Sequence, residues 1–394
     1  MRAFNYDQLH DQKWDSEIVG LVAQIHEYKG RQEIYLQQKP AALDKLIEIA
    51  KVQSTEDSNR IEGIVTTSVR LRQLLQEKTT PRNRDEQEIM GYRDVLNTIH
   101  ENYEYIPIRS SYILQLHRDL YKYSERSIGG RFKNVQNYIT ETKPDGTQIV
   151  RFTPLPPYET EAAIDAICDC FNRAVDAYSI EPLILIPVFI NDFLCIHPFN
   201  DGNGRMSRLL TTLLLYRLGY VVGRYISLES KIASNKDQYY DVLETSGEGW
   251  HEAENDPSAF IKYLLSTILA AYRDFEDRVS LVGQKVPALE MVRGAVMRQY
   301  GKFTKRDIME RCPTLSRASV ENSLSGLTDE DVIVRHGKGR ATYYVRKDAD
   351  HGAFLRQAKE QFDTEIEKGM ADIAAGRLTS AADVRAKMRE DHGV

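Results

Sequence analysis

A short stretch rich in chemically active side chains, residues 197–208, constrains this chain more than any other feature. It reads His-Pro-Phe-Asn-Asp-Gly-Asn-Gly-Arg-Met-Ser-Arg and lies between the apolar runs 194–196 and 209–216. The second run has helical spacing, which predicts that the glycines stand just before a helix N-terminus. Backbone N–H groups and the helix dipole at such a terminus favour anions, and glycine allows a close approach.

The side chains of this stretch predict a site for phosphate and metal. Arg205 and Arg208 are separated by about one helical turn, so both guanidinium groups could reach one anion. Asp201 suits a phosphate that carries Mg²⁺, because this ion takes carboxylate and phosphate oxygens. His197 is then the natural general base towards an attacking hydroxyl group. The alternative is a solvated loop before a core helix, which so dense a set of functional groups disfavours.

The stretch resembles the signature of Fic proteins, His-Pro-Phe-x-(Asp/Glu)-Gly-Asn-Gly-Arg-x-x-Arg, and matches it at every defined position. The resemblance implies a mostly helical fold that transfers AMP from ATP to a Tyr, Thr or Ser hydroxyl of a target protein. It implies that His197 deprotonates this hydroxyl and that Asp201 binds Mg²⁺. The implied ATP-binding residues of the stretch are Gly202, Asn203, Gly204, Arg205, Met206, Ser207 and Arg208. A relative that phosphorylates instead carries Lys at the position of Gly204, so this glycine favours nucleotidyl transfer.

A second motif lies far ahead of the signature. Glu62-Gly63 alone would indicate an ordinary helix end. Together with Ser58 it resembles the inhibitory motif of the same family, (Ser/Thr)-x-x-x-Glu-(Gly/Asn). The resemblance implies that Glu62 pairs with Arg208 and removes the partner of the ATP γ-phosphate. ATP could still bind, with its α-phosphate poorly aligned, and the chain would inhibit itself.

Two β-rich runs, residues 134–139 and 148–152, bracket a Pro-Asp-Gly turn at residues 144–146 and predict a hairpin. In Fic proteins the corresponding hairpin, called the flap, lies over the active site. The resemblance implies that the flap of residues 134–152 holds an extended segment of the target protein by strand addition.

The tyrosine pair Tyr239-Tyr240 can be interpreted in two ways. Paired tyrosines on a helix usually indicate packing. By resemblance to the family, these rings line the adenine and ribose site, and stacking on a purine suits tyrosine. The sequence departs from the family at Gly247, where some relatives have an Asn that contacts the base. Adenine is therefore implied by the resemblance and not by a residue at this position.

Residues 287–346 predict a separate module. Helical segments precede two β-rich runs around the basic turn 336–340, an order that resembles the winged helix that often follows Fic domains. Lys338 and Arg340 on the expected wing suit DNA phosphates weakly, and the expected recognition helix has only Arg317 as a basic group. Binding of DNA and docking of a protein are both open.

The expected fold is mostly α: a Fic-type helical bundle with a β-hairpin flap, then a winged helix and a helical tail. The expected divisions are an N-terminal helical region with the inhibitory motif (1–110), a Fic catalytic core (111–278), the winged helix (287–346) and the tail (347–394). A net charge of −6 gives no general attraction to nucleic acid or anionic membrane. The N-terminus has no signal-like apolar core, and no apolar run reaches transmembrane length. The four cysteines do not have zinc spacing. These features predict a cytoplasmic protein with reduced thiols.

The leading functional hypothesis is a self-inhibited protein adenylyltransferase that uses Mg-ATP and modifies a target protein and itself. A hypothesis from another class is a DNA-binding regulator whose Fic domain only senses nucleotide. A third keeps the chemistry but uses another nucleotide donor or removes AMP. A homodimer is common among Fic proteins, although the sequence contains no interface signature.

Overall fold

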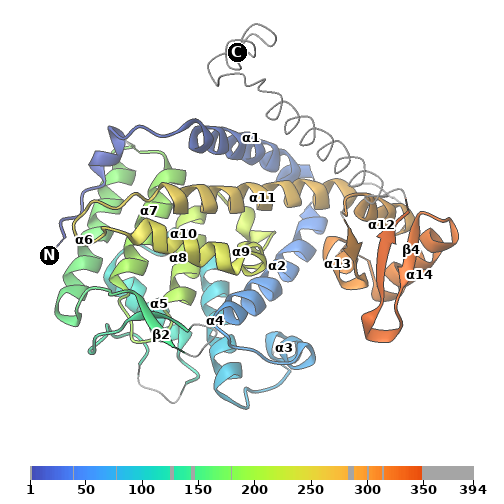
Figure 1. Ribbon diagram of the computed structural model, residues 1–394, viewed down its shortest axis with the longest axis horizontal. Helices are drawn as coiled ribbons and strands as arrows, with labels where there is room; N and C mark the ends of the chain where they lie inside the picture. The colour runs from blue at the N-terminus through green and yellow to red at the C-terminus, as the bar shows by residue number, and fades with distance from the viewer. Residues whose placement is uncertain are drawn as a thin grey trace, which may run out of the picture. The chain divides into compact units, whose positions relative to one another are not determined.

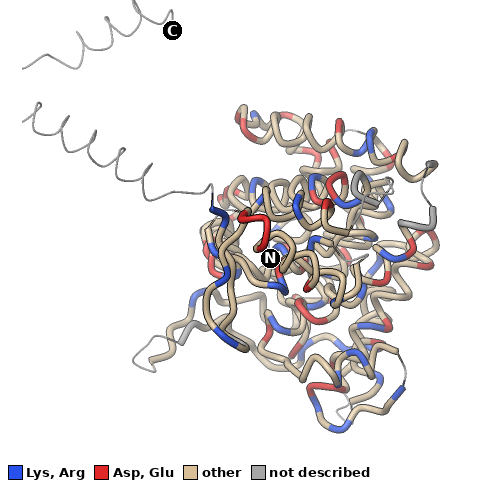
Figure 2. Tube along the Cα trace, turned by 90° about the vertical axis from the view of Figure 1, so that its right-hand side faces the viewer, with Lys and Arg blue, Asp and Glu red and all other residues tan. Residues whose placement is uncertain are grey.

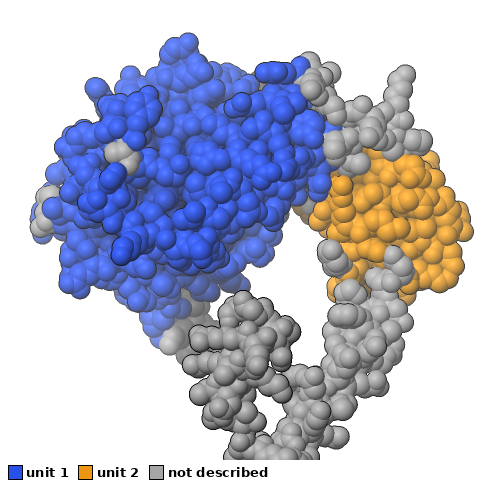
Figure 3. Space-filling view, turned by 90° about the horizontal axis from the view of Figure 1, so that it is seen from above, with its two compact units in different colours: residues 1–285 blue, residues 286–394 orange. Residues whose placement is uncertain are grey.

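The computed structural model of this chain describes residues 2–38, 40–76, 78–124, 128–142, 147–178, 180–282, 288–299, 301–312 and 315–347. The chain divides into two compact units, residues 1–285 and residues 286–394, which Figure 3 shows in different colours. The tail predicted for residues 347–394 lies outside the described residues after Lys347.

Unit 1 is mostly helical, as the sequence predicts (Figure 1). Its elements are η1 (Asp7–His10), α1 (Ser16–Gln38), α2 (Pro40–Ile61), α3 (Ser68–Leu75), α4 (Arg84–Asn102), η2 (Tyr103–Tyr105), α5 (Ser110–Leu120), β1 (Ile139–Thr142), β2 (Gln148–Phe152), α6 (Pro157–Asp176), α7 (Pro182–Ile196), α8 (Asn203–Arg217), η3 (Val222–Arg224), α9 (Leu228–Ser234), α10 (Lys236–Gly247) and α11 (Ser258–Val282). The long helix α11 lies beside α1 along one side of the unit (Figure 1).

Helix α7 is the centre of unit 1. Its sequence is apolar on nearly every side, and every residue from Leu183 to Ile196 is buried. It packs against α6, α8, α10 and α11. Because α7 is enclosed in this way, the residue that follows it, His197, has a rigid support.

The predicted hairpin forms, but its first strand lies further along the chain than the sequence predicts, sharing only Ile139 with the predicted run 134–139. Strand β1 begins at Ile139 and not at residue 134, and it pairs antiparallel with β2. The residues before β1 make other contacts: the backbone N–H of Lys133 and the side chain of Asn137 donate hydrogen bonds to carbonyls of the signature stretch, and the Lys133 ammonium group donates to Ile196 just before it. The turn at residues 143–146 lies outside the described residues.

Unit 2 has its own apolar core, made of Val292, Ala295, Val296, Phe303, Ile308, Cys312, Val320, Leu324, Leu327 and Ile333. Its elements are α12 (Ala288–Met297), β3 (Lys302–Phe303), α13 (Lys305–Arg311), α14 (Arg317–Asp329), β4 (Ile333–His336), η4 (Gly339–Ala341) and β5 (Tyr343–Arg346). The antiparallel sheet has the order β3-β5-β4, and β3 was not predicted. Thr304 and Asp307 form a capping box that starts α13. The assignment of these elements to the winged-helix class stays a prediction.

Charged residues of both signs are interspersed along the chain (Figure 2). Over the described residues, no helix combines the length and the apolar character that crossing a membrane requires. The four cysteines are buried thiols.

Candidate active site

His197 follows the last turn of α7 with a left-handed backbone, φ 51°. Its Nδ1 atom lies 3.2 Å from the carbonyl oxygen of Leu194. A carbonyl oxygen only accepts hydrogen bonds, so Nδ1 carries the proton and Nε2 keeps its lone pair. Burial lowers the pKa of His197 to about 4. The ring is therefore neutral at pH 7 and can accept a proton at Nε2.

The segment before the hairpin holds the backbone around His197. Lys133 donates to the first and third carbonyls of residues 196–199, through its ammonium group at 2.9 Å and its backbone N–H at 2.8 Å. The Asn137 side chain donates to the second and fourth carbonyls at 3.3 and 3.0 Å. Four successive carbonyls are thus bound by two residues. These bonds stabilise a left-handed turn that is unfavourable for a residue other than glycine.

Asn203 closes the loop that follows His197. Its side-chain amide accepts from the N–H of Phe199 at 2.9 Å and donates to the carbonyl of the same residue at 2.8 Å. The ring of Phe199 is buried and stacks on His117, with 3.7 Å between ring centroids. Asn203 is one of the implied ATP-binding residues, and its side chain is engaged within the loop. Its backbone N–H is the group that an anion could use.

Helix α8 begins at the glycines, as predicted. Gly202 is its N-cap with φ 87°, and a Cβ atom there would lie 2.9 Å from the hydroxyl of Tyr121. The first N–H groups of a helix have no acceptor within it, so the start of α8 offers donors to an anion. Met206 is buried in the core, and the Ser207 hydroxyl donates to the carbonyl of Gly204 at 2.8 Å. The side chains of these two residues are therefore occupied within the protein.

Arg208 is buried and bound to the end of α2. Its Nε donates to the Ser58 hydroxyl at 2.8 Å, and its Nη2 donates to the Ser58 carbonyl at 2.9 Å and to Glu62 Oε1 at 2.8 Å. The structure thus brings together all three residues that the inhibitory-motif hypothesis connects. Glu62 Oε1 also lies only 2.2 Å from the position of a Cβ atom built on Gly204. The carboxylate therefore stands at the positive end of α8 as well.

The end of α2 fixes where Glu62 stands. Gly63 has φ 78° and donates from its N–H to Arg60, while the N–H of Ile64 donates to Asn59. This pair of bonds is a Schellman motif with Glu62 at the C-cap position. Local backbone geometry, together with the pairing to Arg208, directs the carboxylate to α8.

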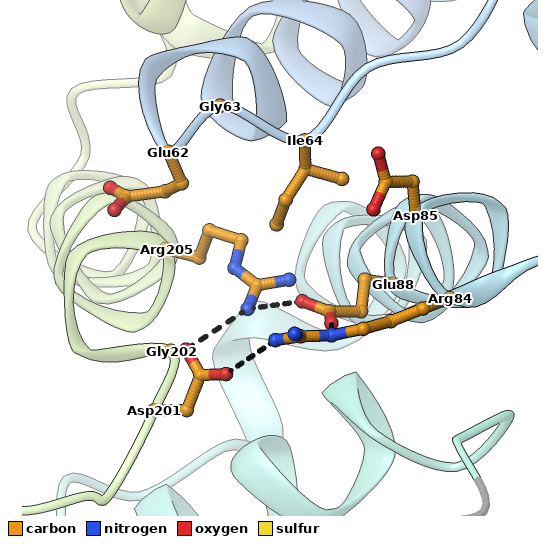
Figure 4. A pocket seen from close by; sticks show the side chains of 9 residues that line it. All are labelled: Glu62, Gly63, Ile64, Arg84, Asp85, Glu88, Asp201, Gly202 and Arg205. Atoms are coloured by element: carbon orange, nitrogen blue, oxygen red, sulfur yellow. Dashed lines mark hydrogen bonds and ion pairs between the residues drawn. The ribbon is translucent and has the colours of Figure 1, made fainter.

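A cavity of about 270 Å³ lies beside Glu62 (Figure 4). It is lined by Glu62, Gly63, Ile64, Arg84, Asp85, Glu88, Asp201, Gly202 and Arg205. Arg205 is buried and lies 2.7 Å from both Glu88 Oε2 and the Tyr121 hydroxyl, and 3.8 Å from Asp201. Arg205 and Arg208 thus have different partners here, and the two guanidinium groups do not meet at one point.

The Asp201 carboxylate is suited to bind Mg²⁺ together with phosphate oxygens of a nucleotide. Its carboxylate is partly exposed and lines the cavity. Within the described residues there is no group of three or more His, Cys, Asp or Glu side chains that could hold a metal. Mg²⁺ commonly binds through one or two carboxylates together with phosphate oxygens. The buried atoms Arg205 Nη1 and Arg208 Nη1 have no hydrogen-bond partner within the described residues, which suits a phosphate group nearby.

Tyr239 and Tyr240 both lie near Arg208, but their surroundings differ. Tyr239 is buried against Tyr263, and its hydroxyl interacts with Ser207 and Arg208. Tyr240 is 42% exposed, with its ring centroid 5.4 Å from that of Tyr239. Tyr240 is the ring with surface left for a ligand, whereas packing accounts for Tyr239. Contact of either ring with a nucleotide stays a prediction.

Sequence reasoning missed four residues of the site: Lys133, Asn137, Arg84 and Glu88. Lys133 and Asn137 reach the signature from more than 60 positions away, and no local pattern marks such contacts. Arg84 and Glu88 form an (i, i+4) pair on α4, which is the one local cue in this set.

Comparison with known proteins places this geometry in a class. The Fic/DOC family matches residues 107–215, which contain α7, the signature stretch and most of α8. A crystal structure of a Fic family protein from Desulfovibrio desulfuricans G20 has a TM-score of 0.55 and 21% identity, covering 85% of this chain and 97% of that one. A Fic domain containing signaling protein from Bacteroides thetaiotaomicron has a TM-score of 0.53 and 25% identity, covering 67% and 97%. The chain thus shares the fold of these Fic proteins, and its residues 107–215 are similar to the Fic/DOC family.

A curated relative carries a more particular name. The protein adenylyltransferase Fic of Culex quinquefasciatus is 25% identical over 216 residues, which is 53% of this chain and 39% of that protein. The protein adenylyltransferase fic-1 of Caenorhabditis elegans is 30% identical over 108 residues, covering 27% and 19%. The chain therefore spans less than half the length of these relatives.

Proposed function

We propose that this protein is a nucleotidyltransferase that moves AMP from Mg-ATP to a hydroxyl group of a target protein and that Glu62 restrains it. The observation that carries the proposal is the meeting of two features. A neutral His197, whose Nε2 keeps its lone pair, follows α7, and a few residues later α8 begins with donors suited to phosphate. Relatives named protein adenylyltransferase support the same reaction.

In the proposed reaction, the triphosphate binds at the start of α8 and Arg208 binds its outer phosphate. Nε2 of His197 takes the proton of the target hydroxyl, whose oxygen then attacks the α-phosphorus. The bond from that phosphorus to the bridging oxygen breaks, and pyrophosphate leaves. Mg²⁺ held by Asp201 would neutralise phosphate charge when bound. Lys133 and Asn137 keep His197 in place during proton transfer.

The restraint follows from the partners of Arg208. A γ-phosphate and the Glu62 carboxylate are both anions that require the same guanidinium group. While Glu62 remains, a triphosphate cannot use Arg208 and is not aligned for attack. A charge-assisted hydrogen bond is worth about 1.5–3 kcal/mol, so its removal should raise the transfer rate by at least about tenfold.

The hairpin of β1 and β2 is the proposed docking strip for the target protein. Arg151 on β2 pairs with Glu244 of α10, with one contact at 2.7 Å, which ties the hairpin to the helix that carries Tyr240. Val150 is 56% exposed, and an extended segment could pair beside it. A tyrosine or serine of the chain itself could be modified in the same way.

The structure does not favour the DNA-binding alternative for α14. Arg317 pairs with Glu321 at 3.0 Å, and Lys305 pairs with the same carboxylate. These pairs reduce the positive charge that α14 could present to DNA phosphates. Lys338 after β4 and Arg335 on that strand are exposed, so the part of the alternative that rests on the wing stays a prediction.

Intact-mass spectrometry tests the proposal. The Glu62→Gly variant is incubated in four separate reactions, each containing Mg²⁺ and one of ATP, GTP, UTP or CTP. A mass gain of one adenylyl group (AMP less water), obtained with ATP and with none of the other three nucleotides, supports adenylyl transfer by self-modification. A gain equal to another nucleotide would replace the proposed donor, and a gain equal to phosphate would replace the proposed reaction.

A further inference from the structure

The side chain of Arg84 spans part of the cavity beside Glu62 (Figure 4). Arg84 is the first residue of α4, after the N-cap Asn83. Its Nη2 donates to Asp201 Oδ2 at 2.9 Å, and its Nε donates to Glu88. The Arg84 side chain is 50% exposed, whereas that of Glu88 is 2% exposed.

Both oxygens of Asp201 face a positive group. Arg84 binds Oδ2, and Arg205 lies 3.8 Å from Oδ1. A divalent cation that approaches this carboxylate therefore meets a guanidinium group on either side. The cation and a guanidinium group would repel each other at this distance, so one guanidinium group has to move away before the cation can bind.

Arg84 is the guanidinium group that can move. Arg205 is buried and bound to Glu88 and Tyr121, so moving it would leave buried charges without partners. Arg84 is half exposed, and partly solvated ion pairs are worth only about 0.2–1 kcal/mol. Its side chain can leave Asp201 at little cost.

We propose that Arg84 takes the place of the metal on Asp201 in the nucleotide-free protein and transfers to a phosphate when Mg-nucleotide arrives. This proposal rests on the proposed function, whose metal site it uses. A free cation would have to displace Arg84 without offering it a new anion. A cation bound to nucleotide brings phosphate oxygens that can accept the guanidinium hydrogen bonds. Metal and nucleotide therefore bind cooperatively, and the protein binds the metal more weakly when nucleotide is absent.

The charges around the cavity set the direction of the expected effect. Its lining includes four carboxylate side chains and only two guanidinium groups. Loss of Arg84 leaves a more negative cavity with an uncovered Asp201. Such a cavity binds a divalent cation more tightly and a triphosphate less tightly.

The experiment measures binding of Mn²⁺ alone by electron paramagnetic resonance, without nucleotide. Arg84→Gln should lower the Kd for Mn²⁺ by up to about fivefold relative to the wild type. Arg82→Gln is the matched control, because Arg82 is exposed, lies two residues away and does not line the cavity. It should leave the Kd unchanged, and Arg84→Lys should keep most of the wild-type behaviour. Adding Asp201→Asn to Arg84→Gln should abolish the gain.

Equal Mn²⁺ affinity of the wild type and Arg84→Gln would overturn the proposal. A second measurement separates this failure from failure of the proposed function. In the wild type, a non-hydrolysable ATP analogue should increase Mn²⁺ affinity, and Asp201→Asn should remove the increase. If Asp201→Asn has no effect with the analogue bound, the metal site of the proposed function is wrong, whatever Arg84 does.

Discussion

Glu62 and Gly204 lie so close together that a methyl group added to Gly204 must displace the Glu62 carboxylate. A Cβ atom on Gly204 would lie 2.2 Å from Glu62 Oε1, and the other atoms nearest to it also belong to Glu62. The far end of a glutamate is flexible, so the carboxylate and not the backbone should give way. The pairing of Glu62 with Arg208 is therefore sensitive to the size of residue 204.

Gly204→Ala should have opposite effects in two backgrounds. In the Glu62→Gly variant, alanine in a helix should stabilise the protein by about 0.5–1 kcal/mol. With Glu62 present, the same change should destabilise it, because the methyl group weakens the Glu62–Arg208 pair. Urea denaturation of the four proteins measures both values. Equal changes in the two backgrounds would show that the contact is not present in solution.

Lys133 should act on the pH dependence of transfer through His197. Burial is the main reason that the pKa of His197 is about 4, well below the ordinary 6.5, and the positive charge of Lys133 lowers this pKa further. Protonation removes the base, so the rate of the Glu62→Gly variant should fall as the pH drops through about 4. Adding Lys133→Met should move this fall in rate to a higher pH, whereas Lys133→Arg, which keeps the positive charge, should leave the fall near its original pH. A rate that decreases equally at every pH would mean that Lys133 has only a structural role.

At the scale of elements, the end of α2 decides the state of the site. Its Schellman motif places Gly63 in the left-handed region, with φ 78°, and Glu62 at the C-cap. Open space surrounds the position of a Cβ atom on Gly63, so substitution there affects only the backbone.

Gly63→Ala should therefore cost about 1–2 kcal/mol of stability by backbone strain alone. We also expect faster AMP transfer, because a distorted helix end no longer holds Glu62 on Arg208. Thermal unfolding measures the first effect and incorporation of labelled AMP the second. Combining Gly63→Ala with Glu62→Gly should give no further activation. Gly63→Ala with wild-type transfer would contradict the role given to this helix end.

The helices were predictable from the sequence where one local signal decides them. Thr304 and Ser316, residue types that favour the N-cap position, cap α13 and α14. The first strand of the flap was predicted to begin too early because Lys133 and Asn137 bind the signature stretch, a contact that has no local pattern. For the same reason the sequence predicted His197 and Asp201 as site residues but not Lys133, Asn137 and Arg84, which bind beside them.

At the scale of the whole molecule, the two units have separate cores. The apolar cluster of unit 1 extends from Tyr6 to Val279, and that of unit 2 from Val292 to Ile333. The candidate site uses side chains of unit 1 alone. Stability and chemistry of unit 1 should therefore not depend on unit 2.

Deleting residues 286–394 from the Glu62→Gly variant should leave a folded protein with a single cooperative unfolding transition. Its rate of AMP transfer should stay within about twofold of that of the full chain, because unit 1 supplies all side chains of the candidate site. A factor of two corresponds to less than about 0.5 kcal/mol in the activation free energy. Calorimetry and labelled-AMP incorporation measure the two properties. Loss of transfer in a well-folded fragment would show that unit 2 takes part in the reaction.

The most direct test of the account compares three proteins incubated with Mg²⁺ and ATP labelled at the α-phosphate. Wild type should incorporate little label, and Glu62→Gly should incorporate at least about tenfold more. Glu62→Gly with His197→Ala should lose about a hundredfold or more of that gain, because the general base is gone. Strong labelling of the double variant would contradict the role of His197, and equal labelling of wild type and Glu62→Gly would contradict the restraint by Glu62.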